Sequence, residues 1–278
     1  MTSFVFQKKT QQALDRTWSS GAHGIVLAGP VGVGLSGAAQ YCIAKFQGAH
    51  AVWVRPEKDK ATDYEKGSIA VDRIRELYDV LKTRDPNGRI VVIDAAERMA
   101  VPAQNAFLKL LEEPPQGVRF ILLTHTPGSL LPTIRSRVQR IDVAPISTKE
   151  SKAFIERFGV VDAKKQAQLL FMADGLPALL TTLLEDEELF EGRAEIVRDA
   201  RTYISGNAYQ RLVIAQKYKD NRTGALQLME DSMLQLRRAA GQSGDSAPLE
   251  RLDSLMGAYD SIRQNGNVRL QLAAAVVV

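Results

Sequence analysis

One stretch constrains the fold of this chain more than any other: an apolar run, a glycine-rich segment and a helix-forming run follow one another between residues 24 and 46. The apolar run Gly24-Ile-Val-Leu-Ala28 is typical of a buried strand, and the residues from Gly37 to Phe46 are typical of a helix. A strand, a glycine turn and a helix N-terminus form the context of a phosphate-binding loop, because the backbone N–H groups of the turn point at an anion.

The glycine segment matches the phosphate-loop pattern GxxxxGK[ST] at Gly29, Gly34 and Ser36, and departs from it at Leu35. The pattern places a lysine there, whose ammonium group pairs with the β- and γ-phosphates of a nucleotide. The turn therefore keeps its backbone donors but lacks its main cation. We predict a nucleotide-binding fold that no longer turns over nucleotide; a glycine turn without any ligand is the alternative.

Strands and helices alternate through the first 145 residues. Four consecutive β-branched residues precede Asp94, which is typical of a strand buried on both faces. The later strand 118–124 ends in Thr124, at the edge of a parallel sheet where ligands of such folds bind. In phosphate-loop enzymes an aspartate in the place of Asp94 holds Mg²⁺ through water. The alternation predicts an α/β fold with a doubly wound parallel sheet over residues 1–145.

The strands stop after residue 145, and helical periodicity continues to the end of the chain. Ser147 and Glu150 form a capping-box pattern that opens the first of three short helices over residues 146–185. The residues 186–278 are also predicted to be helical, with breaks at glycine and asparagine positions. We therefore predict three domains, with boundaries near residues 145 and 185.

Composition sets limits on location and cofactors. No apolar run approaches the roughly 20 residues of a membrane helix, and residues 1–9 lack the apolar core of a signal peptide. A cytoplasmic location without membrane contact is therefore expected. The single cysteine, Cys42, excludes intrachain disulfides and a multi-cysteine metal site, and we expect it to be a buried packing residue.

Charge says little about partners. Residues 1–144 carry a net charge of +5 (19 basic minus 14 acidic residues), and residues 145–278 a net charge of −1 (17 minus 18). The basic half is compatible with nucleic acid or an acidic partner, but an excess this small is more typical of a mixed, solvated surface.

Several stretches resemble one known family. Residues 94–115, with the run Asn105-Ala-Phe-Leu-Lys-Leu-Leu-Glu-Glu-Pro-Pro115, look like the segment after the Walker B strand in bacterial DNA polymerase III clamp-loader subunits. Residues 120–137 resemble the sensor 1 strand and the serine–arginine motif of those subunits. The stretches 69–77 and 267–272 are similar to theirs as well. The resemblance is dense over residues 24–145, and the delta-prime type of subunit is the most similar.

The resemblance implies an AAA+ core in residues 1–145, a helical lid in 146–185 and a helical collar domain for oligomerisation in 186–278. It also implies a degenerate nucleotide site formed by Gly29, Gly32, Gly34, Ser36, Asp94 and Thr124. The partners implied are a gamma/tau-like ATPase, a delta-like subunit, the sliding clamp and primer–template DNA.

Ser136 and Arg137 match the serine–arginine motif of this family. The resemblance implies that Arg137 is an arginine finger, which acts in trans on the γ-phosphate held by a neighbouring subunit. Such a finger stabilises the charge that develops on the transferred phosphoryl group. A surface arginine paired with a carboxylate is the alternative interpretation of Arg137.

Three departures from the ATP-hydrolysing members point the same way. Leu35 replaces the phosphate lysine, Ala95 replaces the acid that activates water, and Ala178 stands where the resemblance places the sensor 2 arginine. We therefore expect a stator, a subunit that hydrolyses no ATP by itself and works within a DNA polymerase III holoenzyme. No cofactor is expected to be required, weak ATP or ADP binding stays open, and a single cysteine cannot supply the family's four-cysteine zinc module.

Two other functions stay open at this point. One is an active AAA+ ATPase, a clamp-loader or helicase-loader relative with an atypical phosphate loop. The other is a DNA-binding adaptor unconnected to sliding clamps. Arg73, Arg75 and Arg98 are candidates for contact with a DNA backbone, with solvated helix residues as the more ordinary explanation.

Overall fold

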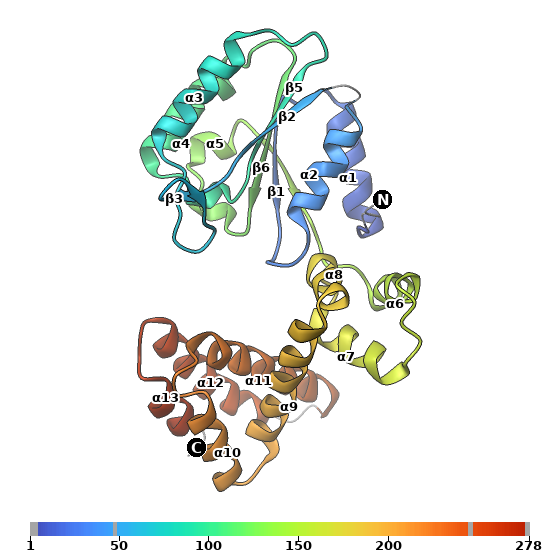
Figure 1. Ribbon diagram of the computed structural model, residues 1–278, viewed down its shortest axis with the longest axis vertical. Helices are drawn as coiled ribbons and strands as arrows, with labels where there is room; N and C mark the ends of the chain where they lie inside the picture. The colour runs from blue at the N-terminus through green and yellow to red at the C-terminus, as the bar shows by residue number, and fades with distance from the viewer. Residues whose placement is uncertain (1–4, 47–48, 244–246, 276–278) are drawn as a thin grey trace. The chain divides into compact units, whose positions relative to one another are not determined.

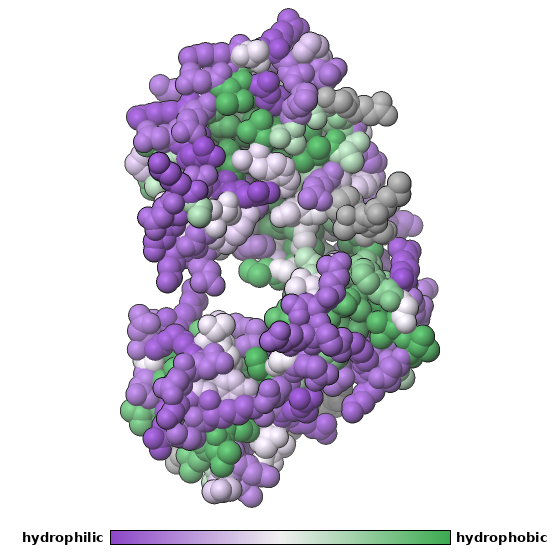
Figure 2. Space-filling view, viewed as in Figure 1, coloured by the Kyte–Doolittle hydropathy of each residue, from purple (hydrophilic) through white to green (hydrophobic). Residues whose placement is uncertain are grey.

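The computed structural model describes residues 5–46, 49–243 and 247–275. The chain forms two compact units, Met1–Thr182 and Leu183–Val278 (Figure 1). Polar side chains cover most of the face drawn in Figure 2, and hydrophobic ones reach the surface in separate patches. None of the helices in the described residues combines the length and the apolar character needed to cross a bilayer.

A five-stranded parallel sheet forms the centre of the N-terminal unit, with the strand order β2-β5-β6-β1-β7. The strands are β1 Gly24–Ala28, β2 His50–Val54, β5 Arg89–Ile93, β6 Val118–Thr124 and β7 Gln139–Asp142. This arrangement confirms the predicted doubly wound parallel sheet. The glycine loop follows β1, which lies between β6 and β7, so the loop emerges at the carboxyl edge of the sheet.

Helices cover both faces of this sheet (Figure 1). On one face lie α1 Lys8–Ser19 and α2 Leu35–Ala44, and on the other α3 Val71–Lys82 and α4 Val101–Glu112. In β1, β5 and β6, alternate residues enter two separate hydrophobic clusters, one on each face of the sheet, which explains why these strands are continuous apolar runs in the sequence. Cys42 of α2 is 1% exposed, as expected for a packing residue, and burial raises the pKa of its thiol to about 12.

Residues 57–66 are charged and poor in apolar residues, a composition that predicts a surface loop, but the structure differs from this prediction. They contain a small antiparallel hairpin, β3 Glu57–Lys58 and β4 Ala61–Thr62. Its turn residues Asp59 and Lys60 adopt positive φ angles of 52° and 65°. Such a turn usually carries asparagine and glycine, so an Asp-Lys pair gives no recognisable signal. The expectation of exposure was correct for most of these residues.

Short elements complete the N-terminal unit: η1 Ala96–Arg98, η2 Pro127–Ser129, α5 Pro132–Arg135, α6 Thr148–Arg157 and α7 Ala163–Ala173. Helix α8 Pro177–Glu185 begins in this unit and continues past its last residue, Thr182. The predicted capping box is present, since Ser147 and Glu150 exchange hydrogen bonds at the start of α6. The division into a core, a lid and a collar at residues 145 and 185 stays a prediction.

The described part of the C-terminal unit is helical, as predicted. It contains α9 Glu187–Ser205, α10 Ala208–Lys217, α11 Arg222–Ser243, α12 Ala247–Arg263 and α13 Val268–Ala274. One hydrophobic cluster joins these helices, and Tyr203 lies fully buried within it. The Tyr203 hydroxyl donates a hydrogen bond to the carbonyl oxygen of Leu272 at 2.5 Å, which links α9 to α13.

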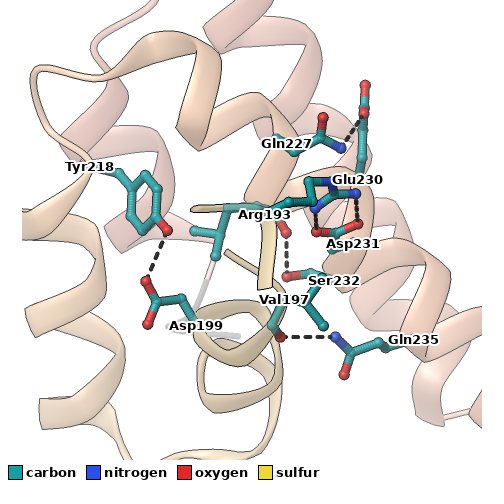
Figure 3. Close-up of polar contacts among 10 residues, drawn as sticks. Arg193, Val197, Asp199, Tyr218, Gln227, Glu230, Asp231, Ser232 and Gln235 are labelled. Carbon is teal, nitrogen blue, oxygen red and sulfur yellow. Dashed lines mark hydrogen bonds and ion pairs between the residues drawn. The ribbon is translucent and has the colours of Figure 1, made fainter. Parts of the chain in front are cut away.

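Polar side chains also cross-link α9 to its neighbours (Figure 3). Arg193 forms a bidentate ion pair with Asp231 of α11, whose side chain is 3% exposed. The Tyr218 hydroxyl donates to Asp199 at 2.8 Å. Burial raises the pKa of Tyr218, and the hydrogen bond to Asp199 raises it further.

Candidate functional site

A cleft of about 910 Å³ opens at the carboxyl edge of the sheet, beside the ends of β1, β5 and β6. It is lined by Val31, Gly32, Gly34, Leu35, Ser36, Tyr64, Asp94, Ala95, Glu97, Arg98, Leu123, His125, Thr126, Ser129 and Ala178. The structure thus brings together four of the residues expected at a nucleotide site. These four are Gly32, Gly34, Ser36 and Asp94.

The glycine loop has the turn that its sequence predicts. Gly32 and Gly34 adopt left-handed φ angles of 84° and 90°, which favour glycine. The first N–H groups of α2 have no carbonyl partner within the helix and lie at the cleft, where Ser36 also lines the wall. The backbone therefore keeps the form of an anion-binding turn.

Leu35 occupies the position of the phosphate lysine and belongs to the hydrophobic core. Its exposed fraction is 5%, and it lies in one cluster with Leu27, Val33 and Ala38. A leucine in this position packs against the sheet and cannot extend a cation into the cleft.

Asp94, at the end of β5, is held by residues of its own chain. The Tyr64 hydroxyl donates to Asp94 Oδ2 at 2.7 Å, and Arg55 Nε lies 3.9 Å from the same oxygen. Burial raises the pKa of Tyr64 to about 12, with a further contribution from this hydrogen bond, so the phenol remains a donor at neutral pH. With Leu35 buried and Asp94 bound in this way, the residues of the cleft do not fit a magnesium–nucleotide complex.

The structure also places Glu97 in the cleft, although it lies three residues beyond Asp94 in the sequence. Its Oε1 atom accepts a hydrogen bond from the backbone N–H of His125 at 3.3 Å. The His125 Nδ1 atom lies 2.7 Å from the carbonyl oxygen of Gly29. Because a carbonyl oxygen only accepts, Nδ1 must carry the proton. Within the described residues, no group of three or more His, Cys, Asp or Glu side chains is arranged to hold a metal ion.

Two of the predicted site residues lie beside the cleft and outside its lining. A Cβ atom on Gly29 would come within 2.5 Å of the Val143 carbonyl oxygen, so only glycine fits there. Thr124 is fully buried, and its hydroxyl accepts a hydrogen bond from the Thr126 N–H at 3.1 Å. Both residues hold the local backbone in place.

Ser136 and Arg137 lie between α5 and β7, outside the cleft lining. Arg137 Nη2 pairs with Glu112 Oε1 at 2.9 Å, and Nη1 donates to the Thr133 carbonyl at 3.0 Å. The Arg137 side chain is 37% exposed. The chain by itself therefore holds this arginine in a surface ion pair, an interaction that is worth only about 0–1 kcal/mol and breaks readily.

Gln104 links the segment after β5 to the segment between β6 and α5, and it was not identified from the sequence. This side chain is 3% exposed; its amide donates to the carbonyls of Met99 and Ser129, and its oxygen accepts from the Leu131 N–H at 2.8 Å. Tyr64 and His125 were also missed. A signal for His125 was present in the sequence, since this residue directly follows Thr124 at the carboxyl end of a strand. Tyr64 lies in a charged stretch that carries no such signal.

Comparison with known sequences identifies the family. The family described as "DNA polymerase III, delta subunit" matches residues 7–147, which is more than half of the chain. The chain belongs to this family. It is 33% identical over 175 residues to DNA polymerase III subunit delta′ of Pseudomonas aeruginosa, covering 62% of this chain and 52% of that protein. It is also 30% identical over 204 residues to DNA polymerase III subunit tau of Bacillus subtilis, covering 64% of this chain and 36% of that protein. The chain spans about half the length, or less, of these relatives.

Solved structures establish the fold of this family member. A gamma subunit-related protein of DNA polymerase III from Thermotoga maritima superimposes with a TM-score of 0.57 at 20% identity, covering 97% of this chain and 98% of that chain. A mutant of RuvB from Thermotoga maritima gives a TM-score of 0.50 at 16% identity, covering 97% of this chain and 87% of that chain. The fold is thus of the AAA+ type, as the sequence resemblance implied.

Proposed function

We propose that this chain is a delta-prime-like stator of a DNA polymerase III clamp loader, which supports the loading of sliding clamps in DNA replication. In this role the chain hydrolyses no ATP itself. It supplies Arg137 as an arginine finger to a neighbouring ATPase subunit, with Ser136 beside it. A gamma/tau-like ATPase, a delta-like subunit, the sliding clamp and primer–template DNA are its partners, and the cytoplasm its location.

One contrast carries this proposal. The phosphate loop keeps its turn, yet the side chain in the lysine position is 5% exposed and packed into the core. Arg137, in comparison, is 37% exposed and held by a single surface ion pair in addition to local hydrogen bonds. A chain whose own cleft lacks the catalytic cation, but which presents a guanidinium at its surface, is suited to assist hydrolysis at an adjacent site.

The decisive experiment compares Arg137→Ala with Arg135→Ala in a clamp loader reconstituted from this chain and its proposed partners. Arg135 is the matched control, because it is an exposed arginine two positions away. We expect Arg137→Ala to slow ATP cleavage at the adjacent site by about 10³-fold or more, measured as single-turnover hydrolysis, because a finger contributes that much elsewhere. Assembly of the complex, followed by size-exclusion chromatography, should not change. Hydrolysis at the parental rate in the Arg137→Ala complex would show that the finger assignment is wrong.

The isolated chain tests the other half of the proposal. We expect it to show no ATP turnover with Mg²⁺ present, and ordinary enzymatic turnover would favour the active ATPase instead. Weak binding of ATP or ADP without turnover is compatible with the stator role. Failure to co-purify with family members that carry an intact phosphate loop would favour a DNA-binding adaptor.

A further inference from the structure

Tyr64 lies at the cleft, in a turn that is held by hydrogen bonds with neighbouring side chains. The turn follows the β3–β4 hairpin, and Asp63 Oδ1 accepts hydrogen bonds from the N–H groups of Glu65 and Lys66, both at 2.8 Å. Arg98 Nη2 donates to the carbonyl oxygen of Tyr64 at 2.9 Å. These contacts tie the turn to the segment that follows β5, so residues of the chain itself hold the backbone of Tyr64 beside the cleft.

The Tyr64 hydroxyl contacts Asp94, the carboxylate that would hold a metal ion in a phosphate-loop site. The hydroxyl lies 2.7 Å from Asp94 Oδ2, which also has the Arg55 guanidinium 3.9 Å away. The Asp94 side chain is 13% exposed, so water reaches little of it. A divalent cation at this oxygen would have to displace the phenol and would be repelled by the positive charge of Arg55.

We propose that Tyr64 takes the place of the hydrated metal ion at Asp94 and thereby closes the cleft to magnesium–nucleotide. This inference rests on the proposed non-hydrolysing role and adds a second barrier to it, which comparison of phosphate-loop sequences does not reveal. Restoring the lysine at position 35 would accordingly not restore metal-dependent nucleotide binding. The hydroxyl of Tyr64 has to be removed as well.

The test compares two double variants of the full chain, Leu35→Lys/Tyr64→Phe and Leu35→Lys/Tyr41→Phe. Tyr41 is the matched control, because its hydroxyl also donates to a carboxylate, Asp15 Oδ1 at 2.9 Å, but outside the cleft. Mn²⁺ serves as the probe for magnesium. Its electron paramagnetic resonance is recorded with ATP and protein and compared with the same mixture of Mn²⁺ and ATP without protein, because ATP itself binds Mn²⁺. We expect the Tyr64→Phe combination to bind Mn²⁺ at least about tenfold more tightly, the effect of one hydrogen bond to a charged group.

Equal Mn²⁺ binding by the two double variants, including no binding by either, overturns this inference. Because Leu35 is buried, the lysine variants need a folding check by circular dichroism. If they do not fold, Tyr64→Phe and Tyr41→Phe are compared in the parental chain with Mn²⁺ alone, and the same criterion applies. The outcome is independent of the finger experiment, since Arg137 and the complex take no part in it.

Discussion

The carbonyl oxygen of Gly32 accepts a hydrogen bond from the backbone N–H of Ala178 at 2.9 Å. The N–H of Leu179 donates to the same oxygen at 3.2 Å. The glycine loop therefore caps the N-terminus of α8, whose first N–H groups have no partner within the helix. The loop whose sequence resembles a phosphate loop therefore also stabilises the helix that begins beside Ala178.

Gly32→Ala should destabilise the protein. Gly32 has a φ angle of 84°, and a Cβ atom there would lie 3.2 Å from Leu179 Cβ. We expect the free energy of unfolding to fall by about 1–2 kcal/mol, the cost of a left-handed backbone for a non-glycine residue. Urea titration followed by circular dichroism measures this change. Gly128→Ala is the control, since a Cβ atom added there would have no neighbouring atom within 4 Å, and equal losses in both variants would contradict the explanation.

Asp231→Ala should lower the free energy of unfolding much more, through its effect on the C-terminal unit. It leaves Arg193, whose side chain is 13% exposed, without its buried partner. We expect a loss of about 3–5 kcal/mol in unfolding free energy, measured by denaturant titration. Asp220→Ala removes an acid that is 86% exposed and should cost less than about 1 kcal/mol. Arg193→Met combined with Asp231→Leu should recover most of the loss, because no unpaired charge remains.

Alkaline pH should weaken the C-terminal unit through Tyr218. Burial and the hydrogen bond to Asp199 raise the pKa of Tyr218 in the folded protein. The folded state therefore favours the protonated phenol, so this contribution to stability is complete below the unfolded pKa of about 10 and is lost as the pH rises above it. Denaturant titrations between pH 9 and pH 11, a range of about one unit on each side of that value, should show a shallower decline for Tyr218→Phe than for the parent. Tyr209→Phe, at a site that is 75% exposed, should show the same decline of stability with pH as the parent.

Glu112→Gln should release Arg137 with little effect on stability. The pair is exposed, with 37% of the Arg137 side chain and 49% of the Glu112 side chain accessible. We expect the unfolding free energy to change by less than about 1 kcal/mol, because exposed ion pairs contribute little. If Arg137 acts in trans, the reconstituted complex should hydrolyse ATP at least as fast as the parent. A large loss of hydrolysis in this variant would instead assign the pair a structural role in the complex.

Local sequence signals predicted most of the fold. The continuous apolar runs of β1, β5 and β6 indicated strands buried on both faces, and both faces are indeed covered. Ser147 and Glu150 predicted the start of α6, because a capping box involves only neighbouring residues. The hairpin of β3 and β4 was missed because its turn, Asp59-Lys60, lacks the usual turn residues.

The candidate site was only partly predictable, for a physical reason. The glycine turn is encoded within eight residues, 29–36, so its form could be predicted from the sequence. The contact of Tyr64 with Asp94 joins residues 30 positions apart, and nothing in a charged stretch indicates which carboxylate a tyrosine will meet. Thr124 has the expected place at the end of a strand, but its hydroxyl serves the backbone of Thr126.

The buried thiol of α2 gives the protein a practical advantage in labelling experiments. Cys42 is the only cysteine in the sequence, and its raised pKa leaves almost no reactive thiolate at neutral pH. Maleimide dyes should therefore react very slowly with the native chain and should label a cysteine introduced at an exposed position such as Arg135. Fluorescence from that position can then report on binding of the proposed partner subunits without prior removal of the natural thiol.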